Sequence, residues 1–91
     1  MSQAFEGVRI IDFTQVFAGP FAVMQLALLG AEVIKVEPIG GDKTRRLKGS
    51  GAGYFSMYNR NKKSLSINLK SEDGARVAKE LIAQSDVFIE N

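Results

Sequence analysis

The order of apolar and turn-forming segments in the first forty residues constrains the fold more than any other feature. An apolar, strand-like run at 8–13 (VRIIDF) is followed by a turn at 14–20 and an apolar helical run at 21–29 (FAVMQLALL). Gly30 favours the end of this helix, because glycine readily adopts a left-handed conformation, and 31–38 (AEVIKVEP) predict a second strand. Strand, helix and strand in this order predict a βαβ unit, which places ligands at the carboxyl ends of its strands.

The turn between the first strand and the helix is the first candidate for a ligand contact, because it leaves the carboxyl end of a strand. It comprises Val16–Pro20, and we expect the helix to begin at Pro20, since proline suits the first helical position. Only Gln25 interrupts the apolar run, so we expect neighbouring structure to cover the helix on nearly all sides. Gln25 is then interpreted as a core or interface amide rather than a catalytic group.

The second half of the chain predicts two further strands and a helix. Residues 64–68 (SLSIN) alternate between polar and apolar types, which predicts a strand with Leu65 and Ile67 pointing inward. A helix over 72–84 follows, with a serine cap and two acidic residues in its first turn, and 86–91 predict a fourth strand. A parallel sheet needs a layer on each face, and no helix follows the last strand. We therefore expect the chain to be an incomplete N-terminal piece of something larger, or to pair with further polypeptide.

A long segment at 39–53 separates the second strand from the rest of the chain. It contains five glycines and four basic residues, and loops of this length are usually functional or mobile. A phosphate-facing loop or lid and a plain surface loop are both compatible with it. Residues 54–59 (YFSMYN) predict one short helical turn whose aromatic side chains pack against the sheet.

The composition excludes several classes of site. Ninety-one residues make one small domain at most. The chain has no cysteine and no histidine, so it cannot by itself build a disulfide, a zinc knuckle, a thiol nucleophile or a Ser-His-Asp site, and we predict no metal site. The N-terminus does not resemble a signal peptide, and the longest apolar run falls far short of the roughly 20 residues that cross a bilayer. We expect a cytoplasmic protein.

Basic residues are concentrated in the middle of the chain. Residues 43–70 hold eight of the twelve basic residues and no acidic residue. The eight are Lys43, Arg45, Arg46, Lys48, Arg60, Lys62, Lys63 and Lys70. A local excess of this kind attracts polyanions, which favours a phosphorylated cofactor or nucleic acid as partner. A solvated basic face is the alternative.

Two carboxylates of the βαβ unit are candidates for a binding or catalytic role. Glu37, at the tip of the second strand, suits a ribose hydroxyl in a dinucleotide site, but the turn at 14–20 has one glycine and no G-x-G-x-x-G fingerprint. A nicotinamide or flavin site is therefore a weak alternative. Asp12 could serve as nucleophile or base, but no histidine or second carboxylate lies nearby in the sequence. Anchoring of the following turn is its favoured role.

Four consecutive motifs resemble the start of the class III CoA-transferases. They are FEGVRIIDFTQVFAGPFA at 5–22, LGAEVIKVEP at 29–38, GGDKTR at 40–45 and YFSMYNRNKKS at 54–64. The resemblance continues through 86–91 and covers essentially the whole chain. This family includes formyl-CoA transferase and carnitine CoA-transferase, with the α-methylacyl-CoA racemases as relatives.

The resemblance implies a Rossmann-like large domain, a smaller second domain and two full-length subunits threaded through each other as an interlocked homodimer. It also implies transfer of coenzyme A (CoA) between carboxylic acids, in which an aspartate attacks the thioester carbonyl and the acyl group passes through anhydride and aspartyl-CoA thioester intermediates. In the family that aspartate lies downstream of this stretch and is not Asp12. The chain alone is therefore expected to hold no catalytic residue and to be inactive. The substrates would be an acyl-CoA and a small carboxylic acid, with no prosthetic group.

Carried over residue by residue, the resemblance places CoA contacts in the loops at the carboxyl ends of the strands. The contacts would fall on Val16, Phe17, Ala18, Ile67, Asn68, Leu69, Lys70 and Asn91. Lys70 suits a phosphate or the adenine edge, and the apolar members suit adenine or the pantetheine arm. Some family members place arginine where this chain has Pro38, so Arg45 or Arg46 is the candidate to take over that phosphate contact.

Two other functions stay open. The segment at 54–63 resembles the transferase version of the family, whereas the racemases shorten it, so transfer is favoured over an α-methylacyl-CoA racemase-type isomerisation. The alternative of another class is a non-enzymatic nucleotide or nucleic-acid binding module that uses the basic segment with Tyr54, Phe55 and Tyr58. No RNP-like or helix-turn-helix pattern supports it, so we predict no nucleic-acid and no membrane partner.

Overall fold

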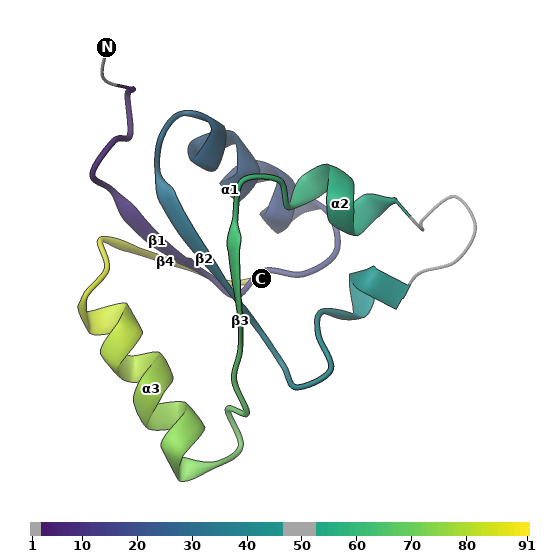
Figure 1. Ribbon diagram of the computed structural model, residues 1–91, viewed down its shortest axis with the longest axis vertical. Coiled ribbons are helices and arrows are strands. Elements are labelled where there is room, and N and C mark those ends of the chain that lie inside the picture. The colour runs from purple at the N-terminus through teal and green to yellow at the C-terminus, as the bar shows by residue number, and fades with distance from the viewer. Residues whose placement is uncertain (1–2, 47–52) are drawn as a thin grey trace.

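The computed structural model describes residues 3–46 and 53–91, which form a four-stranded parallel sheet with helices on both faces (Figure 1). The strands follow the order β3-β2-β1-β4 and are β1 (Arg9–Asp12), β2 (Glu32–Glu37), β3 (Lys63–Ser66) and β4 (Val87–Ile89). The helices are α1 (Ala18–Leu28), the 3-10 helix η1 (Lys43–Arg46), α2 (Tyr54–Tyr58) and α3 (Glu72–Ala83). The predicted α/β class, with parallel βαβ units, is confirmed.

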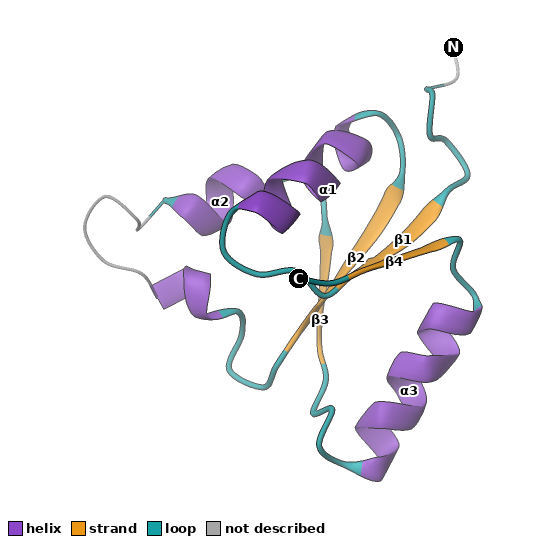
Figure 2. Cartoon of the chain, turned by 180° about the vertical axis from the view of Figure 1, so that it is seen from behind, coloured by secondary structure: helices purple, strands orange, loops and turns teal. Residues whose placement is uncertain are grey.

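The two faces of the sheet are covered by different helices. Figure 2 shows α1 and α2 on one side of the sheet and α3 on the other. Neighbouring residues of a strand point to opposite faces, so Ile10 of β1 joins Val23 and Ala27 of α1 in one buried cluster. Ile11 joins Ala78 of α3 in the other. This double burial explains why β1 reads as a continuous apolar run rather than an alternating one.

The helix ends follow the sequence signals with one exception. The Ser71 hydroxyl accepts the Gly74 N–H at 3.0 Å and caps α3, and Gly30 ends the α1 region with a φ of 108°. The predicted start of α1 at Pro20 is wrong, because the helix begins at Ala18. Pro20 is tolerated inside the first turn, since the first N–H groups of a helix have no intrahelical partner.

One side of α1 is open to solvent. Val23 and Ala27 are buried, but Phe21, Leu28 and Leu29 are between 43% and 47% exposed. The prediction that α1 is covered on nearly all sides is therefore wrong for the described residues, because only one side of the helix faces the sheet. Gln25 also lies on the exposed surface rather than in the core.

β3 is an edge strand, and all four of its residues are exposed. Leu65 is 38% exposed, contrary to the inward position predicted for it, because the buried cluster beneath α3 does not reach the edge strand. Ile67, just beyond the strand, is 6% exposed and belongs to that cluster, as predicted.

The short helix predicted at 54–59 is present as α2, but its tyrosines pack on α1 rather than on the sheet. The Tyr58 ring centroid lies 4.7 Å from that of Phe17 and 5.7 Å from that of Phe21. Phe55 instead faces the guanidinium carbon of Arg45, which lies 3.8 Å from the ring centroid. Residues 47–52 of the loop predicted at 39–53 lie outside the described residues.

Candidate functional site

The loops that leave the carboxyl ends of β1, β2 and β3 line a cavity of about 530 Å³ that is open to solvent. Its wall combines apolar residues with polar ones, among them Ile39, Ile67, Leu69, Gln15, Asn68 and Lys70. Small-molecule sites commonly occupy about 300–1,000 Å³ and combine apolar walls with a few polar groups. The cavity therefore has the size and lining of a ligand site, at the edge of the sheet where a parallel α/β fold places one.

The cavity brings together part of the set of residues predicted to contact a ligand. Ile67, Asn68, Leu69 and Lys70 line it. The remaining predicted residues do not line it: the turn 16–18 follows β1, Asn91 follows β4, and Arg45 lies on η1. These three positions nevertheless follow strands at the same end of the sheet, and each contacts a neighbouring loop or strand as set out below.

The turn after β3 is fixed by its own hydrogen bonds. The Asn68 Oδ1 accepts the Lys70 N–H at 3.1 Å, and the Asn68 carbonyl accepts the Ser71 hydroxyl at 3.0 Å. Leu69 is 45% exposed and presents an apolar surface. Lys70 is exposed, and its ammonium forms no ion pair with any residue that the structure describes. This turn thus offers a cation next to an apolar surface.

The turn after β1 is held by residues on either side of it. The Thr14 N–H donates to Asp12 Oδ1 at 2.8 Å, and the Thr14 hydroxyl donates to the same oxygen, so the predicted anchoring role of Asp12 is confirmed. The side-chain amide of Asn91 accepts the Gln15 N–H at 3.2 Å and donates to the Gln15 carbonyl at 2.9 Å. The end of β4 therefore supports the turn that contains Phe17, which is 47% exposed.

A buried ion pair lies beneath α1. The Lys62 ammonium is 2.8 Å from Asp12 Oδ2 and also donates to the Pro20 carbonyl and to Asn59 Oδ1. Burial lowers the pKa of Lys62, although the Asp12 carboxylate opposes this effect. Both carboxylate oxygens of Asp12 are engaged, by Thr14 and by Lys62, so Asp12 is not available as a nucleophile.

A second buried ion pair connects β2 to the loop that follows it. The Lys35 ammonium lies 3.0 Å from Asp42 Oδ2, and both side chains are at most 2% exposed. Asp42 Oδ1 accepts the Thr44 N–H at 2.8 Å. Burial would raise the pKa of Asp42, but the Thr44 N–H and the Lys35 ammonium outweigh it and hold this pKa below its usual value. Lys35 also donates to the Thr14 carbonyl at 2.7 Å.

Glu37, at the end of β2, is a third buried carboxylate after Asp12 and Asp42. Arg45 donates to its two carboxylate oxygens at 2.7 and 2.8 Å, and the Asp42 N–H and the Ser64 hydroxyl donate to it as well. The hydrogen bond from Arg45, against the opposing effect of burial, lowers the pKa of Glu37 to about 2. Because both oxygens are engaged, Glu37 is not free to bind a ribose hydroxyl.

Three of the eight residues of the basic middle segment pair with acidic residues of the same chain, which the sequence pattern did not reveal. Its ion pairs are Arg45 with Glu37, Lys62 with Asp12 and Lys63 with Glu32. The acidic partners all lie on β1 and β2, so the charge segregation along the sequence becomes charge pairing across the fold. The sequence indicated these pairs only through its charge pattern, in which a net acidic segment precedes the basic one. Lys48 lies outside the described residues.

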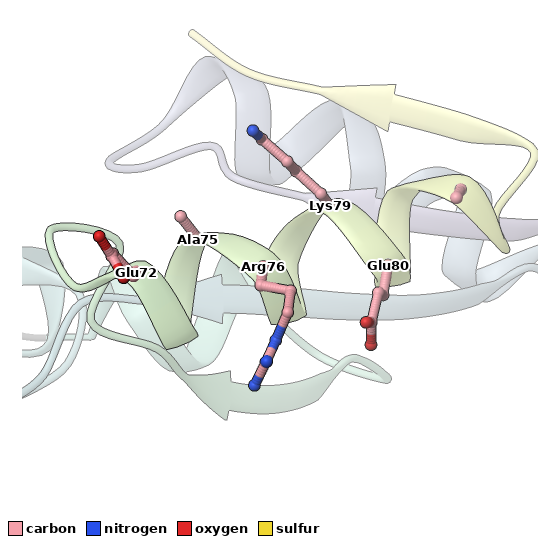
Figure 3. A pocket seen from close by; sticks show the side chains of 6 residues that line it. Glu72, Ala75, Arg76, Lys79 and Glu80 are labelled. Atoms are coloured by element: carbon pink, nitrogen blue, oxygen red, sulfur yellow. The ribbon is translucent and has the colours of Figure 1, made fainter.

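A second hollow, of about 500 Å³, lies on the outer surface of α3 (Figure 3). All six lining residues belong to this one helix: Glu72, Ala75, Arg76, Lys79, Glu80 and Ala83. It is an open helix surface and offers no converging groups. Within residues 3–46 and 53–91, no cluster of three or more acidic side chains could hold a metal ion. None of the helices in the same residues combines the length and apolar character needed to cross a bilayer.

Known proteins share both the sequence and the fold. The profile of CoA-transferase family III matches residues 5–91. A mouse protein named succinyl-CoA:glutarate CoA-transferase is 55% identical over 91 aligned residues, which cover 94% of this chain and 21% of the mouse protein. A formyl-CoA:oxalate CoA-transferase from Streptomyces avermitilis is 45% identical over 95 aligned residues, covering 100% of this chain and 23% of that protein.

Solved structures with a similar sequence also share the fold of this chain. A CAIB/BAIF family protein from Brucella suis superposes with a TM-score of 0.90 at 34% identity, covering 100% of this chain and 26% of that chain. A hypothetical protein, Rv3272, from Mycobacterium tuberculosis gives a TM-score of 0.89 at 40% identity, covering 96% and 25%. The chain thus spans about a fifth to a quarter of the proteins it matches. Sequence profile, relatives and fold agree, and the chain belongs to CoA-transferase family III.

Proposed function

We propose that this chain forms CoA-binding surface in an enzyme that transfers CoA between carboxylic acids through an aspartyl-linked acyl intermediate. The observation that carries the proposal is the cavity of about 530 Å³ at the carboxyl ends of the strands, where the Lys70 side chain stands beside apolar residues. CoA needs both features, because it combines charged phosphates with an apolar pantetheine arm and a flat adenine. Relatives named CoA-transferases support transfer over isomerisation.

The parts of the cavity suit different parts of CoA. Lys70 would contact a phosphate, since its ammonium is exposed and forms no ion pair with the described residues. Ile39 and Leu69 would contact adenine or the pantetheine arm, because both are large apolar residues that are 69% and 45% exposed. On the neighbouring loop, Phe17 would extend this apolar surface along the arm.

The attacking carboxylate is proposed to lie outside residues 1–91. Asp12, the acid at the carboxyl end of β1, is fully buried and bound by Thr14 and Lys62, so it cannot reach a thioester carbonyl. This chain would bind and orient the CoA portion of the substrate. An acyl-CoA and a small carboxylic acid would be the reactants, as in the names of the relatives, and the intact protein would act as a homodimer. The exposed apolar side of α1 supplies surface for packing against further polypeptide.

CoA binding tests the proposal most directly. Isothermal titration of the intact protein that contains this chain should show micromolar binding of CoA and no response to NAD. Lys70→Ala should weaken this binding by about five- to tenfold, because it removes a charge-assisted contact worth about 1–1.5 kcal/mol. Lys79→Ala is the matched control, since Lys79 lies on the outer surface of α3, and it should bind CoA as the unmodified protein does.

Two results would contradict the proposal. Salt-sensitive binding of an oligonucleotide without any response to CoA would favour a nucleic-acid module instead. Unchanged CoA affinity in Lys70→Ala would remove Lys70 from the site. Incubation with succinyl-CoA and glutarate, or with formyl-CoA and oxalate, then tests whether either pair of reactants supports transfer.

A further inference from the structure

Val16 adopts a backbone conformation that its side chain disfavours. Its φ is +74°, in the left-handed region that β-branched residues almost never occupy. Such a conformation costs on the scale of a hydrogen bond or more and persists only where the surroundings enforce it. Val16 lies in the turn after β1, next to Phe17 and Ala18. Contacts with other residues must therefore hold the turn after β1 in this conformation.

The hydroxyl of Thr44 contacts the strained residue directly. The Val16 N–H donates to Thr44 Oγ1 at 3.1 Å, although the two residues are 28 positions apart in the sequence. Thr44 lies on η1 and is completely buried. Because Thr44 is completely buried, its hydroxyl has little room to move and is suited to fix the position of the Val16 amide.

Thr44 is itself held by buried charges that return to the same turn. The Thr44 N–H donates to Asp42, Asp42 pairs with Lys35 at 3.0 Å, and Lys35 donates to the Thr14 carbonyl at 2.7 Å. Thr14 lies two residues before Val16. The contacts therefore form a closed circuit that begins and ends in the turn after β1, and the side chains of Thr44, Asp42 and Lys35 in it are at most 2% exposed.

We propose that Thr44 is a positioning residue: its buried hydroxyl, fixed by Asp42 and Lys35, sets the backbone of the Val16–Ala18 turn for ligand binding. The inference rests on the proposed function, because that turn is a proposed CoA contact. It extends that function to a residue that does not line the cavity. The segment 42–44, which follows β2, would thus control a loop that follows β1.

Thr44→Val tests the inference, because valine keeps the shape of threonine and removes the hydroxyl. In the intact protein, CoA affinity should fall by about tenfold, as expected for the loss of one buried hydrogen bond. With an acyl-CoA that the enzyme accepts, KM should rise while kcat changes little, since only uniform binding is lost. Thr44→Ser keeps the hydroxyl and should restore most of the affinity. Ser85→Ala, which removes a side-chain hydrogen bond at the end of α3, should leave CoA affinity unchanged.

Amide hydrogen exchange separates this inference from the proposed function. The Val16 amide should exchange slowly in the unmodified protein and faster in Thr44→Val, whether or not the protein binds CoA. Absence of protection in the unmodified protein would overturn the inference even if Thr44→Val fails to fold. Thr44→Val that melts at a lower temperature but binds CoA normally would assign Thr44 to stability alone and also overturn it. Failure of the unmodified protein to bind CoA would contradict the proposed function, while the exchange result would still stand.

Discussion

Gly74 shows how a single absent methyl group shapes the candidate site. A Cβ at this position would overlap the carbonyl oxygen of Asn68 and lie 2.7 Å from its carbonyl carbon. Gly74 is in the first turn of α3, and Asn68 belongs to the turn that lines the cavity. The helix can therefore approach the site only because residue 74 has no side chain.

Gly74→Ala should destabilise the protein by about 1–3 kcal/mol, because the added Cβ forces the backbone of the turn or of the helix to shift. The higher helix propensity of alanine, about 1 kcal/mol, offsets part of this cost. Urea unfolding of the intact protein measures the change. Gly53→Ala is the matched control, since a Cβ there meets nothing within 4 Å, and it should change stability by less than about 0.5 kcal/mol. Equal stability of Gly74→Ala and the unmodified protein would show that the close approach is absent in solution.

At the scale of elements, Lys62, just before β3, and Lys63, the first residue of that strand, have opposite roles. The Lys62 side chain is 2% exposed and bound by Asp12, whereas the Lys63 side chain is 72% exposed and lies 3.2 Å from Glu32. Successive side chains point to opposite faces of a strand, so one lysine enters the layer beneath α1 and the other reaches solvent at the sheet edge. The first pair connects the residue that precedes β3 to β1, on the far side of β2.

Lys62→Met should cost about 3–5 kcal/mol of folding free energy, because it leaves the fully buried Asp12 carboxylate without a countercharge. Lys63→Met should cost less than about 1 kcal/mol, since exposed ion pairs contribute little. Thermal and urea denaturation of the two variants, side by side, give the comparison. Adding Asp12→Asn to Lys62→Met should recover part of the lost stability by removing the unpaired charge. Similar losses for the two lysine variants would contradict the buried position of Lys62.

At the scale of the whole molecule, the two faces of the sheet are built differently. The α3 face is an apolar cluster around Ile11, Val36 and Ile67. The other face has an apolar cluster beneath α1 and, toward the carboxyl ends of the strands, the buried charges of Asp12, Lys35 and Glu37. Asp12 of β1 pairs with Lys62, just before β3. Lys35 and Glu37 of β2 pair with Asp42, just before η1, and with Arg45 of η1. Folding of this half of the molecule therefore depends on the ionisation of its carboxylates.

Acid should destabilise the protein, and protonation of Glu37 should account for part of the lost stability. Its folded-state pKa of about 2 lies below the ordinary value of 4.5, so its contribution is complete above pH 4.5 and is lost as the pH falls toward 2. At about 1.4 kcal/mol per pKa unit this contribution is about 3 kcal/mol. Denaturant unfolding at pH 6 and pH 3 should show a smaller acid-induced loss in Glu37→Gln than in the unmodified protein. Glu80→Gln, on the outer surface of α3, should retain the full loss; equal acid sensitivity of all three proteins would contradict the assignment.

The sequence by itself determined the order of the elements and the parallel sheet, and its resemblance to the CoA-transferases pointed to the turn after β3. Those features follow from signals that act within a few residues: the apolar run of β1, the left-handed Gly30 and the Ser71 cap. Tertiary structure alone decided which charges pair, because Lys62 and Asp12 are 50 residues apart and meet only when β3 joins the sheet. It also decided that Leu65 is exposed and that Thr44 reaches Val16. Contacts of this kind depend on how strands and loops are placed side by side, and local sequence patterns carry no record of that placement.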